Sequence, residues 1–324
     1  MTGESYLSSE IDSAELRAQY DAHVRRLLKD KGVLAYILIH AVEEFRNYSL
    51  EEARSAIEGE PEVSVRPVRP SDAMPEAMNG EETESNIPGE GRMFFDIVFT
   101  VRTIDQTRQK IYINLEAQKE FYPGYDLVSR GVVYGCRMIS QQMDTEYTSK
   151  DYDGVKKVYS IWICMNTPDR NNESEKVSDT IVEYAMEPKV LYKEQDIGNV
   201  AYGRYDLLSV LFICLKDDDT RLSENKLVSM LSVLLSSKMG IEDKKRELEE
   251  KYHLPMTREM ERRAAEMCNL SEAIEERAEK RGMVKAREAM KAEMEAERRM
   301  AQEALKAKDE EIKALKALVA SLQR

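Results

Sequence analysis

Two neighbouring apolar runs constrain the fold of this chain of 324 residues more than any other part of it. The first run, residues 93–99, is nearly all apolar and predicts a buried strand with one carboxylate, Asp96, in its middle. The second run, residues 110–118, alternates strictly between apolar and polar side chains, which is the pattern of a strand with one buried face. Its polar positions are Tyr112, Asn114, Glu116 and Gln118.

These two runs form a hairpin if Asp96 lies opposite Glu116. The same register pairs Phe99 with Ile113 and leaves residues 103–109 for the turn, which is a usable length. A buried carboxylate is costly unless a cation or a metal pairs with it. Two carboxylates and the amide that follows them on the same face would suit a hard cation such as Mg²⁺. The alternative interpretation is that Asp96 is paired with an arginine and that the polar face is solvated.

An Asp on one strand and Glu-x-Gln on its neighbour is also the layout of a metal-dependent phosphodiesterase. The carboxylates would hold one or two Mg²⁺ ions, which polarise the phosphate and lower the pKa of a bound water. The third position on this face usually orients the attacking water. Here that position is Gln118, whose amide can hydrogen-bond a water but can neither carry positive charge nor take its proton.

The acidic charge of the chain is concentrated in one segment. The net charge of -13 argues against a protein that coats nucleic acid over its whole surface. Residues 51–90 hold eleven acidic and three basic residues together with five prolines, and this composition predicts a long acidic loop. The candidates for a local basic groove, which are equally well explained as solvated surface charges, are Arg25, Arg26, Lys29, Lys31, Lys150, Lys156 and Lys157.

Cysteine spacing and hydropathy indicate the cellular setting. The four cysteines are widely spaced and match neither a metal site nor a disulfide framework, so we expect reduced thiols. The longest apolar run, residues 33–42, is too short to span a bilayer. We therefore expect a soluble, cytoplasmic protein with no membrane partner.

Hydrophobic periodicity gives the remaining elements. It predicts one long amphipathic helix over residues 24–45, a helix over 126–143 that Asp126 could cap, a central strand over 157–165 and a helix over 222–239. The apolar run 207–215 is of ambiguous type. The expected organisation is an N-terminal arm over 1–23, a domain over 24–240 with an acidic loop insertion at 51–90, and a charged helical tail over 241–324.

Two of the predicted helices carry further patterns. On the helix over 126–143, a single polar stripe is formed by Arg130, Tyr134, Arg137 and Gln141. In the tail, a short heptad seam with Lys308 in one of its positions is formed by Leu305, Ile312, Leu315, Val319 and Leu322. This seam predicts either self-association as a short coiled coil or a plain solvated helix, because it covers fewer than three full heptads.

Several short sequence segments, taken in their order along the chain, resemble those of a known family. The segments that carry the resemblance are Phe95-Asp96-Ile97, Ile113-Asn114-Leu115-Glu116-Ala117-Gln118-Lys119, Tyr122-Pro123-Gly124-Tyr125, Ser129-Arg130-Gly131, Arg137-Met138-Ile139-Ser140 and Val158-Tyr159-Ser160-Ile161-Trp162-Ile163-Cys164. Over residues 24–240 they resemble the PD-(D/E)XK nuclease family transposases, also called recombination-promoting nucleases. The resemblance implies an α/β fold with a restriction-endonuclease-like αβββαβ core and a C-terminal helical tail.

The same resemblance implies roles for individual residues. Asp96 corresponds to the Asp of the motif and Glu116 to its Asp/Glu, whereas Gln118 stands where the wider superfamily has lysine, so catalysis would rest on these three and metal binding on the two carboxylates. Glu44 corresponds to an additional acid of many members, although plain helix surface explains it too. Phe95 stands where the motif has proline.

Further expectations concern substrate and cofactor. Arg130, Tyr134 and Arg137 lie where related nucleases place polar helix residues facing the site, so they would orient ligands or touch phosphate, unless Tyr134 only packs the helix on the sheet. The implied cofactor is Mg²⁺, or Mn²⁺, and the implied partner is DNA. Two functions follow: a metal-dependent DNA endonuclease linked to a mobile element or recombination, or an inactive nuclease-fold module that acts through helical self-association.

Overall fold

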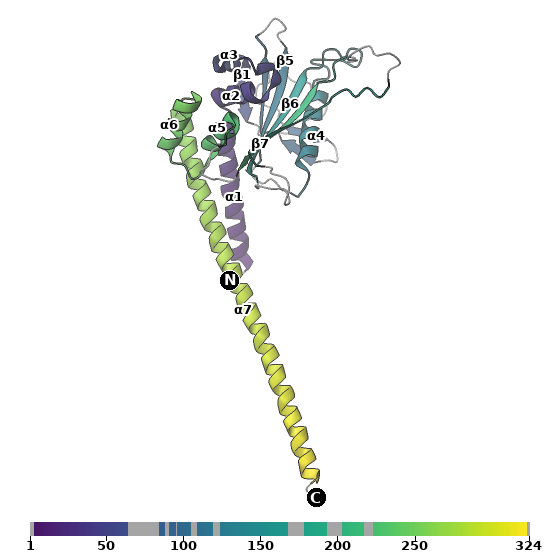
Figure 1. Ribbon diagram of the computed structural model, residues 1–324, viewed down its shortest axis with the longest axis vertical. Helices are drawn as coiled ribbons and strands as arrows, with labels where there is room; N and C mark the ends of the chain where they lie inside the picture. Colours follow the sequence, from purple (N-terminus) through teal and green to yellow (C-terminus); the bar gives the residue numbers. More distant parts are fainter. Residues whose placement is uncertain are drawn as a thin grey trace. The chain divides into compact units, whose positions relative to one another are not determined.

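The computed structural model describes most of the chain and divides it into two compact units (Figure 1). One unit is residues 17–270, and the other is residues 1–16 together with 271–324. The described residues are 3–63, 84–87, 91–94, 96–104, 109–118, 124–167, 178–192, 203–216 and 223–322.

A six-stranded mixed sheet forms the centre of the unit 17–270. Its strand order is β1-β4-β5-β6-β8-β7, in which β5, β6 and β8 run parallel and the other neighbours pair antiparallel. The bounds of the six strands are Ile57–Val63 (β1), Ile97–Arg102 (β4), Lys110–Gln118 (β5), Lys157–Thr167 (β6), Thr180–Ala185 (β7) and Leu208–Lys216 (β8). A separate hairpin pairs β2 (Glu84–Ile87) with β3 (Gly91–Phe94).

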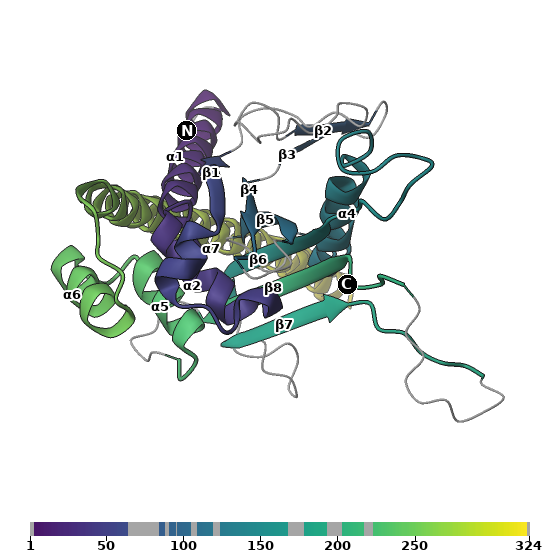
Figure 2. The same cartoon turned by 90° about the horizontal axis from the view of Figure 1, so that it is seen from above.

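Helices cover both faces of this sheet, as Figure 2 shows. Helix α4 (Leu127–Ser140) packs on β6 and β8 from one side. On the other side lie α2 (Lys31–Ala41) and α5 (Lys226–Leu235), which contact each other, and α3 (Leu50–Ser55) packs on α2. The predicted α/β class is therefore confirmed, with a mixed six-stranded sheet between helices.

The predicted register of the central hairpin is correct. Phe99 pairs with Ile113 and Ile97 pairs with Leu115, so Asp96 comes directly before β4 and faces Glu116. The prediction of one strand over 93–99 is wrong, because β3 ends at Phe94 and β4 begins at Ile97 with Asp96 in a bend. The side chain of Asp96 accepts the backbone N–H of Ala117, so a side-chain acceptor replaces a ladder carbonyl at this point.

The predicted single helix over residues 24–45 is also wrong. Helix α1 (Gly3–Leu28) ends before Asp30, and Asp30 begins a new helix by accepting the backbone N–H groups of Gly32 and Val33. This N-cap satisfies two of the donors that a helix start leaves without partners. After α2 the chain forms a short 3₁₀ helix, Glu43–Phe45.

Part of the predicted acidic loop over 51–90 is regular structure. Ser49 and Glu52 form a capping box that starts α3, and Ala56 and Ile57 are buried where β1 joins the sheet. The loop prediction is therefore wrong for residues 51–63 and 84–87, which lie in α3, in β1 with the turn at Ala56 between them, and in β2. The other positions of the segment lie outside the described residues.

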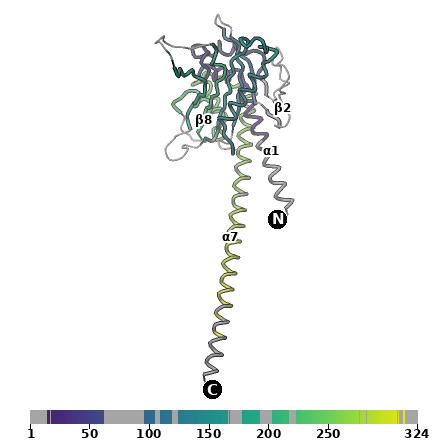
Figure 3. The backbone as a smooth tube through the Cα atoms, turned by 90° about the vertical axis from the view of Figure 1, so that its right-hand side faces the viewer, coloured from purple at the N-terminus to yellow at the C-terminus, as the bar shows by residue number. Residues whose placement is uncertain are grey.

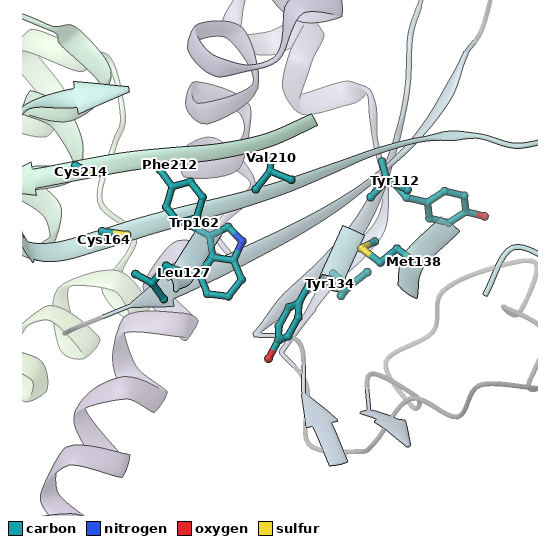
Figure 4. Packing of buried hydrophobic residues seen from close by; sticks show 11 residues of the cluster. Tyr112, Leu127, Tyr134, Met138, Trp162, Cys164, Val210, Phe212 and Cys214 are labelled. Atoms are coloured by element: carbon teal, nitrogen blue, oxygen red, sulfur yellow. The ribbon is translucent and has the colours of Figure 1, made fainter. Parts of the chain in front are cut away.

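The remaining elements mostly follow the predictions. Asp126 caps α4, Asn225 caps α5, and the ambiguous run 207–215 is the central strand β8. The core between α4 and the sheet is built around Trp162, as Figure 4 shows. All four cysteines are free.

The C-terminal part of the chain is helical, as predicted. It forms α6 (Ile241–Tyr252) and the continuous helix α7 (Arg258–Leu322), which Figure 3 traces. Leu305 and Ile312 of the predicted heptad are exposed, whereas the side chains of Leu315, Val319 and Leu322 lie outside the described set. No helix among the described residues is both long enough and apolar enough to cross a membrane.

Candidate functional site

Asp96 and Glu116 come together at the end of the β4–β5 hairpin. The backbone N–H of Asp96 donates a hydrogen bond of 3.0 Å to Oε1 of Glu116. The backbone N–H of Ala117 donates one of 2.9 Å to Oδ2 of Asp96. Each carboxylate is thus held by the backbone of the opposite strand, and the two predicted ligands are adjacent.

The two carboxylates repel each other in a buried setting. Burial and then the charge of Asp96 raise the pKa of Glu116 well above its ordinary value, although Arg130 lowers it in part. Burial also raises the pKa of Asp96, against the opposing charge of Arg25. A divalent cation would relieve this repulsion, since it favours the charged form of both groups.

An arginine pairs with Asp96, as the alternative interpretation of the sequence proposed. Nη1 of Arg25, in the last turn of α1, lies 3.2 Å from Oδ1 of Asp96. Nε of Arg25 is buried and has no hydrogen-bond partner among the described residues. From the sequence, Arg25 is only one of several candidates for a local basic groove. A contact between residues 71 positions apart leaves no local pattern in the sequence.

Asn114 adds a buried amide to the same face of β5. Its side chain is completely buried and lies two residues before Glu116 on the face toward α4. Neither its nitrogen nor its oxygen has a hydrogen-bond partner of good geometry within the described part of the chain. The amide nevertheless lies close enough to Glu116 to lower the pKa of that carboxyl. A buried amide with poorly satisfied hydrogen bonds costs free energy, so a polar ligand or a water would suit this position.

Arg130 completes the site from helix α4. Its guanidinium donates to the hydroxyls of Tyr134, at 2.7 Å, and Tyr125, and it lies 5.2 Å from the ring of Trp162. Figure 4 shows the indole of Trp162 between Tyr134 and Phe212. Burial raises the pKa of Tyr134 to about 12, so its hydroxyl stays protonated.

Tyr134 therefore both packs on the sheet and holds Arg130 toward Glu116. The structure shows the predicted packing role, with the ring of Tyr134 against Trp162, and adds a hydrogen bond from Arg130. Tyr125, which is half exposed, is a site residue that the sequence patterns did not indicate. The available sequence signal was the position of Tyr125, five residues before Arg130 and directly before the N-cap of α4.

Gln118 and Arg137 lie at the borders of the site. Gln118 is the last residue of β5, is partly buried and pairs in register with Cys164 of β6. Arg137 lies two turns beyond Arg130 on α4.

Glu44, a candidate metal ligand, lies elsewhere. Its carboxylate binds Nζ of Lys157 at 2.9 Å and accepts from the hydroxyl of Tyr159 at 2.7 Å. Tyr159 is on the face of β6 opposite to Trp162, because side chains alternate along a strand. The assignment of Glu44 to the metal site is therefore not supported by its position, and buried Lys157 is not part of a surface groove.

The donor set of the site is small and made of oxygen atoms. Among the residues that the structure describes, no group of three or more His, Cys, Asp or Glu side chains could hold a metal ion. Two carboxylates with neighbouring amides fit a hard cation that keeps several of its waters, as Mg²⁺ usually does. They do not fit a soft metal, which prefers thiolate ligands.

Comparisons of the chain with models of protein families, with curated proteins and with solved structures find no match.

Proposed function

We propose that this protein is a Mg²⁺-dependent DNA endonuclease that hydrolyses phosphodiester bonds. The observation that carries the proposal is the pair of carboxylates, buried Glu116 and partly buried Asp96, held side by side by backbone N–H groups across the hairpin. The cost of burying two like charges is difficult to explain as a contribution to stability alone.

The order of the elements supports the same proposal. A helix precedes β1, β4 and β5, and α4 then connects β5 to the parallel strand β6. Apart from the separate β2–β3 hairpin, this order is consistent with the αβββαβ core that the resemblance to PD-(D/E)XK nucleases implies. The carboxylates lie on the β4–β5 hairpin, where that family has its motif.

The residues of the site would divide the work. Asp96 and Glu116 would hold the cation, which when bound polarises a phosphate and lowers the pKa of a coordinated water. The amide of Gln118 would orient a water by hydrogen bonding, although it cannot accept the proton. Arg130, directed at the carboxylates by Tyr134, would stabilise negative charge on the phosphate.

The test is cleavage of plasmid DNA by the purified protein in Mg²⁺. We expect nicked or linear product from the wild type and none from Asp96→Ala or Glu116→Ala. Glu43→Ala, which changes an exposed carboxylate outside the site, is the matched control and should cleave normally. Cleavage that survives both site changes would contradict the proposal.

A second candidate function is a non-catalytic module that assembles through α7. The ion pair between Arg25 and Asp96 favours it, because an arginine already balances one carboxylate. Exposed Leu305 and Ile312 on the helix are consistent with self-association. If deletion of residues 271–324 leaves the oligomeric state in light scattering unchanged, this candidate is excluded.

A further inference from the structure

Arg25 makes little use of its hydrogen-bonding capacity. A guanidinium has five N–H donors in a planar fork. The structure shows one contact, from Nη1 to Oδ1 of Asp96, and a buried Nε without a partner among the described residues. Its side chain is largely covered, with 28% of its surface exposed. The guanidinium therefore lies at the carboxylate pair and keeps N–H donors that can bind further acceptors.

The position of Arg25 conflicts with a cation on the same oxygen. A divalent ion bound to Oδ1 of Asp96 would stand where Nη1 now lies, and the two positive groups would repel each other. The oxygen has two lone pairs, but the repulsion between two positive groups on it favours movement of Arg25 away from Asp96 when the cation binds. Arg25 thus acts as an internal counter-ion of the cation-free site.

Among the described residues, Asp96 is the acceptor that the structure shows for this guanidinium, so the displaced group can bind an acceptor on a ligand. With a divalent cation on Asp96 and Glu116, the two carboxylates, two arginines and the cation leave the site with net positive charge. A phosphodiester is the ligand that suits it, because a guanidinium binds two phosphate oxygens through parallel hydrogen bonds. Arg130 lies on the α4 side of the carboxylates and is already held by Tyr134 and Tyr125.

We propose that Arg25 is a phosphate-binding residue that rests on Asp96 until a divalent cation takes this carboxylate, and then binds the DNA phosphate beside the cation. This inference rests on the proposed nuclease function. It assigns to the last turn of α1 a direct part in substrate binding, and it couples binding of the cation to binding of DNA.

The test uses Arg25→Met, which keeps an apolar stem and removes the charge, and Arg25→Lys, which keeps the charge and removes the fork. Arg26→Met is the control, because Arg26 is the exposed neighbour on the same helix. Binding of Ca²⁺ and Mg²⁺ can be followed by the fluorescence of Trp162, the single tryptophan, which lies beside Arg130. Binding of a DNA duplex is measured in Ca²⁺ at several salt concentrations.

Arg25→Met should change the two affinities in opposite directions. Loss of the competing charge should tighten cation binding severalfold. Loss of a charge-assisted contact should weaken DNA binding by about tenfold and lower the salt slope by about 0.9, the value for one phosphate contact. Arg25→Lys should keep the salt slope and bind DNA with intermediate affinity, and Arg26→Met should leave cation affinity unchanged.

The failures of the two proposals are distinguishable. If cation binding does not depend on Asp96, the nuclease proposal fails and this one fails with it. If cation binding depends on Asp96 but Arg25→Met leaves both affinities unchanged, or weakens both, only the role of Arg25 is overturned. If Arg25→Met does not fold, Arg25→Lys decides, since a purely structural ion pair predicts DNA affinity equal to that of the wild type.

Discussion

The backbone N–H of Asp96 donates to Oε1 of Glu116 at 3.0 Å, while Oδ2 of Asp96 accepts the N–H of the residue after Glu116 at 2.9 Å. Backbone hydrogen bonds therefore keep the two carboxylates together. This preorganisation means that a cation finds its ligands in place, and that the cation-free protein bears the cost of their repulsion.

Glu116→Gln should separate stability from activity. The amide oxygen can still accept the N–H of Asp96, and the repulsion between two buried carboxylates disappears, so the cation-free protein should melt at a higher temperature. Cleavage in Mg²⁺ should be lost. Calorimetry without divalent ions tests the first outcome, with Glu51→Gln on the exposed surface of α3 as the control. A lower melting temperature would mean that the carboxylate of Glu116 is stabilising.

Asn114→Leu should likewise stabilise the free protein. The change keeps the size of the side chain and removes a buried amide that makes no hydrogen bond of good geometry in the described part of the chain. An unsatisfied buried polar group costs about 1 to 3 kcal/mol, whereas the contact of this amide with Glu116 is lost. Cation affinity should fall if the amide serves the site. Urea unfolding and Mg²⁺ titration measure the two effects. Loss of stability would instead show that an ordered water satisfies Asn114 in the free protein.

The hairpin was predictable because its pattern is local and strict. Alternation in 110–118 fixed which residues share a face, and pairing Asp96 with Glu116 then fixed the register that the structure has. Asp126 was a recognisable cap for the same reason. The break at Asp30 was missed because apolar periodicity continues across it, although an Asp before Gly32 and Val33 is an N-cap signal.

Contacts between residues distant in sequence cannot be predicted from local alternation or from capping residues. The pairing of Arg25 with Asp96, and of Glu44 with Lys157 and Tyr159, depends on how the helices before β1 lie on the sheet. Glu44 is a candidate metal ligand only through the family resemblance, and strand alternation places its partners on the other face of β6.

Lys157→Met should show that Glu44 is structural. The change would leave the largely buried carboxylate of Glu44 without its lysine partner, which costs about 3 kcal/mol or more. Combining it with Glu44→Gln should recover much of this loss, because the unpaired charge disappears. A double-mutant cycle in urea measures the coupling. Cleavage per folded molecule should stay normal in the double variant. Loss of cleavage would show instead that Glu44 contributes to the active site.

Gly131→Ala should loosen α4 from the sheet. A Cβ at this position would lie 2.6 Å from Cγ1 of Val210 and 3.0 Å from Nε1 of Trp162, so we expect destabilisation of about 1 to 3 kcal/mol and a shift in Trp162 fluorescence. Gly282→Ala in α7 is the matched control, since its Cβ meets nothing within 4 Å and alanine favours a helix. Equal effects of both changes would contradict close packing at Gly131.

Glu146 should make stability depend on pH in a defined direction. Burial alone would raise its pKa, but hydrogen bonds from Lys110 and Tyr112 outweigh burial and lower the pKa below the ordinary 4.5. A carboxyl whose pKa is lower in the folded state adds stability that is complete above the unfolded pKa and is lost as the pH falls through the folded pKa. The difference in stability between wild type and Glu146→Gln should therefore be constant near neutral pH and shrink below about pH 4.5. Thermal unfolding across this range measures it, and a difference that grows on acidification would contradict the assignment.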